Sequence, residues 1–198
     1  MSRDENIELE TLPGIFEREA VQLLGMVAGS GLDIVPADLL DGPHAADVIG
    51  YIGEIFVRAY CLSECAVIVC SDRDKAAIVK GYAMVFQRGD APAFLHCARI
   101  MPQYLDDLSH DQLIDDVLEC YPLLLTLCHP EDVPFFERHG FWYAGRTEIP
   151  PRHNFLLAQQ LYGDTVMMAR GDKTALDVPA FMLNDRNLRT IKTLALGV

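Results

Sequence analysis

The pattern of hydrophobic and polar positions along the chain predicts alternating strands and helices. The clearest segment runs from Pro122 to Phe141, where the nearly all-apolar run Leu123–Leu127 precedes a His-Pro break. A run this short and this apolar is typical of a strand buried on both faces. Glu131 and Asp132 then favour the start of a helix, and Gly140 favours its end. The segment therefore predicts a strand, a short helix and a second strand.

The same periodicities predict the rest of the chain, in the order strand, two helices, three strands, helix, strand, short helix and two strands. Alternating positions indicate half-buried strands, and apolar residues three or four apart indicate helices. Short polar links between the three central strands favour an antiparallel meander. The expected strands are 6–12, 65–70, 76–87, 93–103, 123–127, 141–148 and 165–169, and the expected helices are 15–28, 44–60, 109–121 and a short one around 135–136.

Length and composition indicate one folded domain with a substantial core, because the 198 residues are 51% hydrophobic and 23% charged. The acidic N-terminal segment lacks the apolar core of a signal peptide, and no run reaches 18 apolar residues, so we expect a cytoplasmic protein. The net charge of −13 argues against nucleic acid and anionic membranes as partners. A basic protein surface is favoured instead.

Six cysteines lie mostly within apolar stretches, and in a reducing compartment this favours buried free thiols. Cys61 and Cys65 are separated by three residues but have no second matching pair, so the sequence favours no metal site. Cys128 and His129 are neighbours, and the side chains of neighbours point to opposite faces of a strand. This argues against a cysteine nucleophile activated by that histidine.

Two separated motifs then resemble the GNAT superfamily of N-acetyltransferases. Family members typically carry the phrase Asn-Pro-x-Ala-x-x-Phe-Tyr-x-x-x-Gly-Phe after a buried strand. Four residues of this chain match that phrase, namely Pro130, Phe135, Gly140 and Phe141. The segment Ile100–Tyr104 resembles the end of the family's fourth strand, which commonly reads Val-x-Pro-x-Tyr.

The segment GDTVMMARG at 163–171 is similar to the family's last strand. The resemblance implies an α/β fold with a mixed, mostly antiparallel sheet of about seven strands flanked by about four helices. It implies a GNAT-like domain over residues 1–171. Residues 172–198 extend past the family core as a basic amphipathic tail, which we expect to fold back on the acidic third helix or to cross to a second subunit of a homodimer.

The resemblance also implies a cofactor, acetyl-CoA, and a place for it. In the family the fourth and fifth strands run parallel and splay apart, and acyl-CoA inserts its pantetheine arm between them. Here the backbone of Arg99, Ile100 and Met101 would bind that arm like an added strand. The family binds the CoA diphosphate on a Gly-rich turn at the start of the third helix, near Ser109 and His110 in this chain.

That turn departs from the family pattern. Residues 105–110 contain no glycine, and Asp106 and Asp107 stand where basic and glycine residues are expected. Ser109 and Gln112 have the spacing of a capping box, in which side chains take the amide groups that a phosphate would otherwise use. Two alternatives follow: either CoA binds through its pantetheine alone, or the phosphate loop is displaced.

The expected catalytic positions are altered as well. Phe136 aligns with the tyrosine that commonly serves as general acid, and it carries no transferable proton. His129 aligns with the family asparagine. Three interpretations of it stay open: a substitute acid, a cofactor contact or a cap for the next helix. Tyr143 is a candidate acid or a structural aromatic residue. His96, in the middle of a strand beside the expected gap, is a candidate general base or a hydrogen-bonded core histidine.

Two hypotheses of function remain open. The chain is an N-acyltransferase that moves an acyl group from acyl-CoA to an amine of a small molecule or protein. Alternatively, it is a catalytically inactive member of the fold whose acidic surface binds a basic protein partner.

Overall fold

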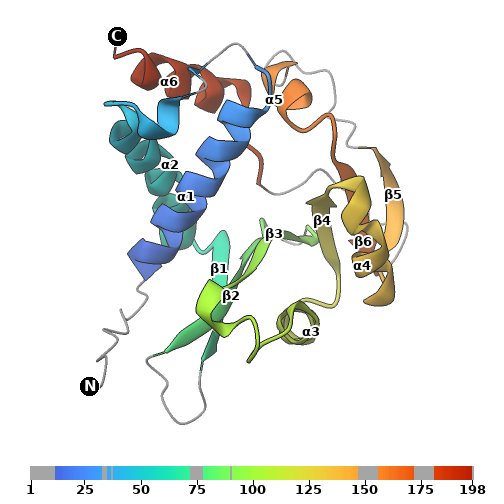
Figure 1. Cartoon of the computed structure of the whole chain (residues 1–198). Coiled ribbons are helices and arrows are strands. Elements are labelled where there is room, and N and C mark those ends of the chain that lie inside the picture. The colour runs from blue at the N-terminus through green and yellow to red at the C-terminus, as the bar shows by residue number, and fades with distance from the viewer. Residues whose placement is uncertain are drawn as a thin grey trace, which may run out of the picture.

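The computed structural model describes residues 12–32, 35–36, 38–71, 78–89, 91–146, 156–171 and 181–197. Its strands form one sheet in the order β1-β2-β3-β4-β6-β5 (Figure 1). The strands are β1 (Cys65–Ser71), β2 (Val79–Phe86), β3 (Ala93–Ile100), β4 (Leu124–Cys128), β5 (Trp142–Arg146) and β6 (Val166–Arg170). The helices are α1 (Leu12–Gly29), α2 (Ala45–Cys61), α3 (His110–Cys120), α4 (Val133–Arg138), α5 (Leu156–Leu161) and α6 (Asp185–Ala195).

The sheet is mixed and mostly antiparallel, as expected. Among the described residues only β3 and β4 pair in parallel, and β1, β2 and β3 form the predicted antiparallel meander. The described part has six strands where about seven were expected, and the expected strand at 6–12 lies outside it except for Leu12, which begins α1. It has six α-helices where about four were expected, because residues 156–161 and 185–195 also form helices.

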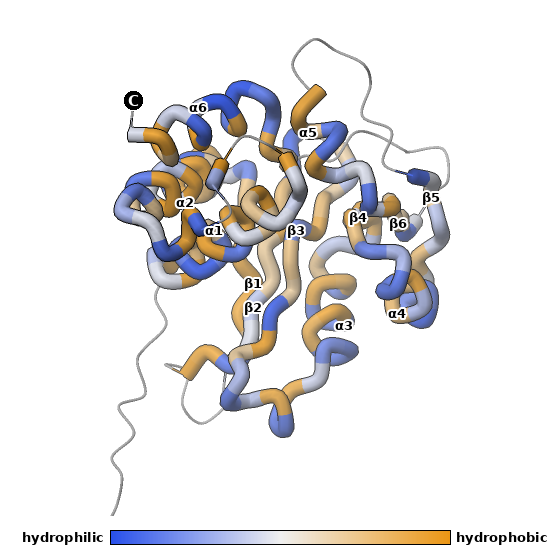
Figure 2. The backbone as a smooth tube through the Cα atoms, turned by 45° about the horizontal axis from the view of Figure 1, so that its top comes forward, coloured by the Kyte–Doolittle hydropathy of each residue, from blue (hydrophilic) through white to orange (hydrophobic). Residues whose placement is uncertain are grey.

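Helices cover both faces of the sheet, and the sheet separates two clusters of core residues. One cluster lies under α1, α2 and α6 and includes Phe16, Phe56 and Leu188. The other lies under α3 and includes Leu113 and Val117. The central strands are apolar over most of their length, whereas hydrophilic residues recur along α6 (Figure 2). None of the helices in the described ranges is long and apolar enough to cross a membrane.

The C-terminal helix α6 packs against α2 and α5 at the end of the molecule away from α3 (Figure 1). The expectation that the tail folds onto the acidic third helix is therefore wrong. Leu188, Ile191 and Ala195 bury one stripe of α6 in the larger core cluster, and the Asn187 side chain donates a hydrogen bond to the Tyr51 hydroxyl of α2 at 3.0 Å. Apolar burial beside α2 thus decides the position of α6, and charge attraction to α3 does not.

Asp185, at the first position of α6, holds the start of α5. Its carboxylate is 2% exposed and accepts hydrogen bonds from the backbone amides of Leu156, Leu157 and Ala158 at 3.0, 2.9 and 3.1 Å. The first amides of a helix have no partner within the helix, so a carboxylate there satisfies several at once. One side chain of α6 therefore fixes the start of α5.

We expect Asp185→Ala to lower the free energy of unfolding by about 2 kcal/mol, because three amides at the start of α5, one of them fully buried, lose their acceptor. Urea denaturation followed by circular dichroism measures the change. Asp164→Ala removes an exposed carboxylate close to α5 and should change the value by less than about 0.5 kcal/mol. Equal effects of the two substitutions would contradict this role for Asp185.

Candidate functional site

Strands β3 and β4 pair over a short stretch and then separate. The parallel register joins Ala93 with Leu124, Phe94 with Leu125 and Leu95 with Thr126, and it continues no further. At the last pair the Thr126 hydroxyl donates a hydrogen bond to the Leu95 carbonyl at 3.0 Å. Beyond it β3 runs on to Ile100 without a partner on this side among the described residues. The parallel, splayed pair expected from the resemblance is present.

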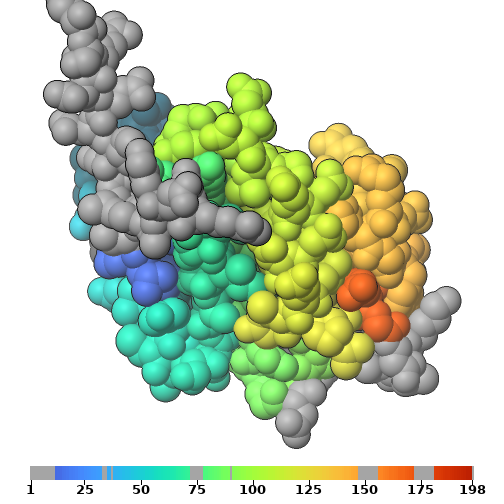
Figure 3. All heavy atoms as spheres, turned by 90° about the horizontal axis from the view of Figure 1, so that it is seen from below, coloured from blue at the N-terminus to red at the C-terminus, as the bar shows by residue number. Residues whose placement is uncertain are grey.

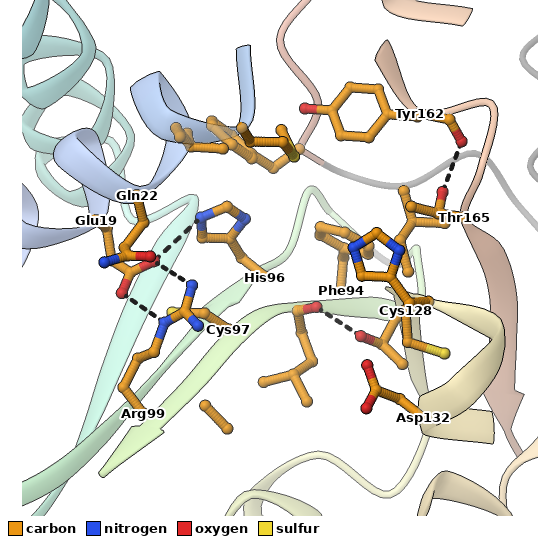
Figure 4. A pocket seen from close by; sticks show the side chains of 18 of the residues that line it. Glu19, Gln22, Phe94, His96, Cys97, Arg99, Cys128, Asp132, Tyr162 and Thr165 are labelled. Carbon is orange, nitrogen blue, oxygen red and sulfur yellow. Dashed lines mark hydrogen bonds and ion pairs between the residues drawn. The ribbon is translucent and has the colours of Figure 1, made fainter. Parts of the chain in front are cut away.

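A cavity of about 930 Å³ runs along this gap (Figure 4). Its volume is at the upper end of the range usual for small-molecule sites. One end lies against α1, and the other lies between α3 and α4. The α1 end is lined by Glu19, Gln22, Met26 and Leu40, and the α3 and α4 end by His110, Ile114, Asp132, Phe135 and Phe136. Two reactants approaching from opposite ends would therefore meet beside the separated strands.

A β-bulge in β3 places two consecutive side chains on one face. Met84 of β2 pairs with Cys97, but Val85 pairs with Leu95, so His96 is an extra residue with no partner on β2. A bulge locally breaks the alternation of side chains and re-aims them. His96 and Cys97 consequently both approach Glu19 of α1, and the ligating atoms of the three residues lie within 4.8 Å of one another.

Glu19 is the charged centre of this cluster. It is 1% exposed, and one carboxylate oxygen accepts hydrogen bonds from the Tyr82 hydroxyl at 2.7 Å and from Arg99 Nε at 3.0 Å. Burial favours the neutral carboxyl, but the neighbouring Arg99, His96 and Tyr82 together hold the pKa of Glu19 below its usual value. The site therefore contains an ionised carboxylate whose charge Arg99 compensates.

His96 faces the other oxygen of that carboxylate without bonding to it. Its Nε2 lies 3.9 Å from Glu19 Oε2 and has no hydrogen-bond partner in the structure as described. The rings of Phe56, Phe86 and Phe181 surround the imidazole, with centroids 5.5, 5.7 and 5.0 Å away. Burial lowers the pKa of His96 to about 4, so the imidazole is neutral at neutral pH. A buried, unsatisfied nitrogen that lines a cavity is suited to a ligand or a proton.

The structure separates the other candidate catalytic residues. His129 lines the cavity at the end of β4 and begins a 3₁₀ turn (Pro130–Asp132) without a side-chain capping bond, so the interpretation as a helix cap has no support. Phe136 also lines the cavity. Tyr143 lies on β5, is 51% exposed and is not part of the lining. The physical reason is that β6 inserts between β4 and β5, so the strand that follows α4 in sequence is not next to β4 in space.

Of the candidate cofactor residues, some line the cavity and others do not. The Arg99 side chain lines the cavity, whereas Ile100 and Met101 do not, and the Met101 amide donates to the Lys80 carbonyl of β2 at 2.9 Å. His110 lines the cavity and lies edge-to-face with Phe135. Ser109 forms the predicted capping box with Gln112, which is confirmed.

Sequence reasoning missed four residues of the site: Glu19, Cys97, Tyr162 and Phe181. Glu19 had a usable signal, because it interrupts the apolar stripe of its helix three residues after Phe16. Tyr162 lines the cavity and its hydroxyl accepts a hydrogen bond from the Leu183 amide at 3.2 Å. Burial raises the pKa of Tyr162 to about 12, so the phenol keeps its proton. Phe181 comes from the C-terminal extension.

Glu19, His96 and Cys97 are ligand types that hold divalent metals. However, the Arg99 guanidinium already lies 3.0 Å from Glu19 and supplies the compensating positive charge. Burial also raises the pKa of the Cys97 thiol well above its usual value, which opposes the thiolate that a metal requires. The cluster as it stands does not fit a metal ion.

The residues around the gap fit one part of acyl-CoA and not the other. The unpaired edge of β3 and the apolar lining suit a neutral, amide-containing arm. The start of α3 does not suit a diphosphate, because Asp106 and Asp107 precede it and its capping box uses amides that a phosphate would need.

In comparisons with known proteins, no family model and no characterised sequence matches this chain. Solved structures do resemble it. A putative acetyltransferase of the GNAT family from Desulfovibrio desulfuricans is 17% identical, with 78% of this chain and 93% of that chain covered and a TM-score of 0.42. A variant of spermidine N-acetyltransferase from Vibrio cholerae is 15% identical, with 65% and 78% covered and a TM-score of 0.45.

A GNAT family acetyltransferase from Elizabethkingia anophelis, solved with acetyl-CoA bound, is 11% identical, with 60% and 82% covered and a TM-score of 0.41. The solved structures found thus include members of the superfamily that the sequence motifs resemble. At these levels of identity and TM-score, the function of this chain has to be argued from its own residues.

The lowered pKa of His96 has a consequence for stability. Between pH 6.5 and pH 4 the unfolded chain binds a proton at this histidine and the folded chain does not, so stability rises with pH across this window. The contribution present at neutral pH, up to about 3 kcal/mol, is lost as the pH falls towards 4. We expect His96→Gln to remove this part of the pH dependence.

Urea denaturation of both proteins at several pH values between 4 and 7 checks this, with equal m-values showing that both unfold in the same way. If parent and His96→Gln lose stability in parallel over that window, the histidine is not held neutral by burial.

Proposed function

We propose that this chain is an acyltransferase that moves an acyl group from a thioester to an amine in the cavity between β3 and β4. The observation that carries the proposal is a cavity that follows a splayed parallel strand pair and is lined by a buried imidazole with an unpartnered nitrogen. His129, Phe135 and Phe136, from the segment that carries the GNAT-like phrase, line this cavity and support the same interpretation.

The free edge of β3 binds the donor. Beyond Leu95 the strand has no partner towards β4, so the amides of an extended arm can pair with it as an added strand would. Leu95, Ile114 and Phe136 make this part of the cavity apolar and keep water from the thioester. The thioester carbonyl then lies beside the bulge at His96.

The acceptor amine enters from the α1 end and approaches His96. As its nitrogen forms a bond to the thioester carbonyl carbon, the amine proton passes to His96 Nε2, and the Glu19 carboxylate 3.9 Å away stabilises the imidazolium. The carbon–sulfur bond breaks and the thiolate leaves. Phe136 has no proton to give it, and we assign that step to the protonated phenol of Tyr162, which lines the same cavity.

A second candidate function, binding of a basic protein partner without catalysis, is favoured by one observation. The turn before α3 and the exposed face of that helix carry six acidic residues and no lysine or arginine: Asp106, Asp107, Asp111, Asp115, Asp116 and Glu119. Such a face suits a cationic surface, and it places no demand on the cavity.

We expect His96→Ala to lower kcat/KM for acyl transfer to a primary amine by about 10²–10⁴-fold, because the proton acceptor is lost. Affinity for the thioester should stay within about threefold, since His96 acts on the acceptor. Thiol release from an acetyl thioester in the presence of a panel of amines measures the rate, and calorimetry measures the affinity.

His44→Ala provides the matched control, because His44 is a partly exposed residue at the start of α2 that does not line the cavity, and it should behave as the parent. Absence of binding of any acetyl thioester at millimolar concentration would refute the acyltransferase and leave the binding protein.

A further inference from the structure

The turn between β3 and α3 satisfies its own backbone amides. The Tyr104 amide donates to the Met101 carbonyl at 2.8 Å, and the amides of Asp107 and Leu108 both donate to the Tyr104 carbonyl at 3.0 Å. Anion-binding turns work through the opposite arrangement, in which successive amides point outward without a partner. These three amides are therefore not available to a phosphate.

Three amides at the start of α3 also have partners within the chain. The Ser109 amide donates to Gln112 Oε1 at 3.0 Å, and the Gln112 amide donates to Ser109 Oγ at 3.2 Å. The Leu113 amide donates to the Ser109 carbonyl, also at 3.2 Å. The usual anion site at a helix N-terminus consists of unpaired amides, and here side chains of the helix itself have taken two of them.

The charges nearby have the wrong sign for an anion. Asp106 and Asp107 lie in the turn, and Asp111 lies in the first turn of the helix. Within the described ranges, basic side chains that approach this region lie against these carboxylates: Lys80 Nζ is 3.6 Å from Asp107, and Arg138 Nη2 is 3.8 Å from Asp111. The imidazole Nε2 of His139 lies 3.1 Å from Asp111. A diphosphate placed here would face three carboxylates and would have to compete for each cation.

The shape of the turn also prevents close approach. Residues 101–110 contain no glycine, and this segment of the chain forms part of the exposed surface (Figure 3). Leu108 packs over Gly81 of β2, where an added Cβ would come within 2.8 Å of the leucine methyl. That contact holds the turn against the sheet in its closed form.

The neighbouring part of the cavity has the opposite character. Towards α3 and α4 its lining combines the apolar Ile114, Phe135 and Phe136 with His110 and Asp132, and it joins the unpaired edge of β3. An uncharged arm carrying amides fits this surface, and a nucleotide diphosphate does not fit the turn beyond it. The chain thus favours binding of the pantetheine arm of CoA and disfavours binding of its nucleotide diphosphate.

We propose that the acyl donor of this chain is a thioester on an uncharged, pantetheine-type carrier that lacks the nucleotide diphosphate of CoA. This inference rests on the acyl-transfer function proposed above and specifies the donor for the same cavity. Recognition comes from the gap between β3 and β4, and the acidic turn before α3 selects against nucleotide-bearing thioesters.

Calorimetric titration of S-acetyl-pantetheine and acetyl-CoA into the full chain tests the inference. We expect S-acetyl-pantetheine to bind at least as tightly as acetyl-CoA at low ionic strength. Raising the salt concentration should strengthen the binding of acetyl-CoA, because salt screens the repulsion between its phosphates and the aspartates, and should leave that of S-acetyl-pantetheine unchanged.

The double substitution Asp106→Asn with Asp107→Asn removes two of the three repelling charges, and neither residue lines the cavity. It should tighten acetyl-CoA binding about fivefold or more and leave S-acetyl-pantetheine binding within about twofold. The matched control, Asp115→Asn with Glu119→Gln, removes the same charge from the exposed face of the same helix and should change both affinities by less than about twofold.

The outcomes separate the two levels of the proposal. Acetyl-CoA binding about tenfold or more tighter than S-acetyl-pantetheine would overturn this inference and leave the acyltransferase standing. The same holds if the substitutions at Asp106 and Asp107 do not change acetyl-CoA binding. Failure of both thioesters to bind would overturn the proposed function together with the inference.

Discussion

The interaction on which the site depends is the parallel pairing of β3 and β4, and above all its early end. Three residue pairs hold the two strands together. Where the pairing stops, the Thr126 hydroxyl donates a hydrogen bond to the Leu95 carbonyl. If β3 and β4 paired over more residues, the gap would close. If they did not pair at all, the sheet would separate between β3 and β4. Because the strands join at one end only, the sheet stays continuous while an unpaired strand edge lines a cavity.

The bulge at His96 adds chemistry to that gap. One extra residue in β3 turns both His96 and Cys97 towards Glu19, and Arg99 returns to the same carboxylate from further along the strand. The carboxylate is satisfied and the imidazole is not. The aromatic wall that keeps the imidazole neutral includes Phe181, so the C-terminal extension, anchored through Asp185 and α6, helps to set the protonation state of the site.

The sequence predicted the parts of this arrangement that depend on local patterns. The apolar run before His129 predicted strand β4, and the glycine at 140 predicted the end of the short helix. The spacing of Ser109 and Gln112 predicted the capping box of α3. It did not predict the Glu19 cluster, because that depends on a bulge and on contacts about 80 residues apart. Nor did it predict that Tyr143 lies away from the cavity lining, since strand order in space is set by long-range pairing.

The most direct test of the central claim is to locate a bound thioester on the backbone. Two-dimensional ¹H–¹⁵N NMR spectra recorded during titration with S-acetyl-pantetheine report each amide separately. The account predicts shifts concentrated in β3 after Leu95 and in β4 from Thr126 to Cys128, with the capped amides of Ser109 and Gln112 unchanged. Shifts confined to other surfaces, with both strands unaffected, would contradict it.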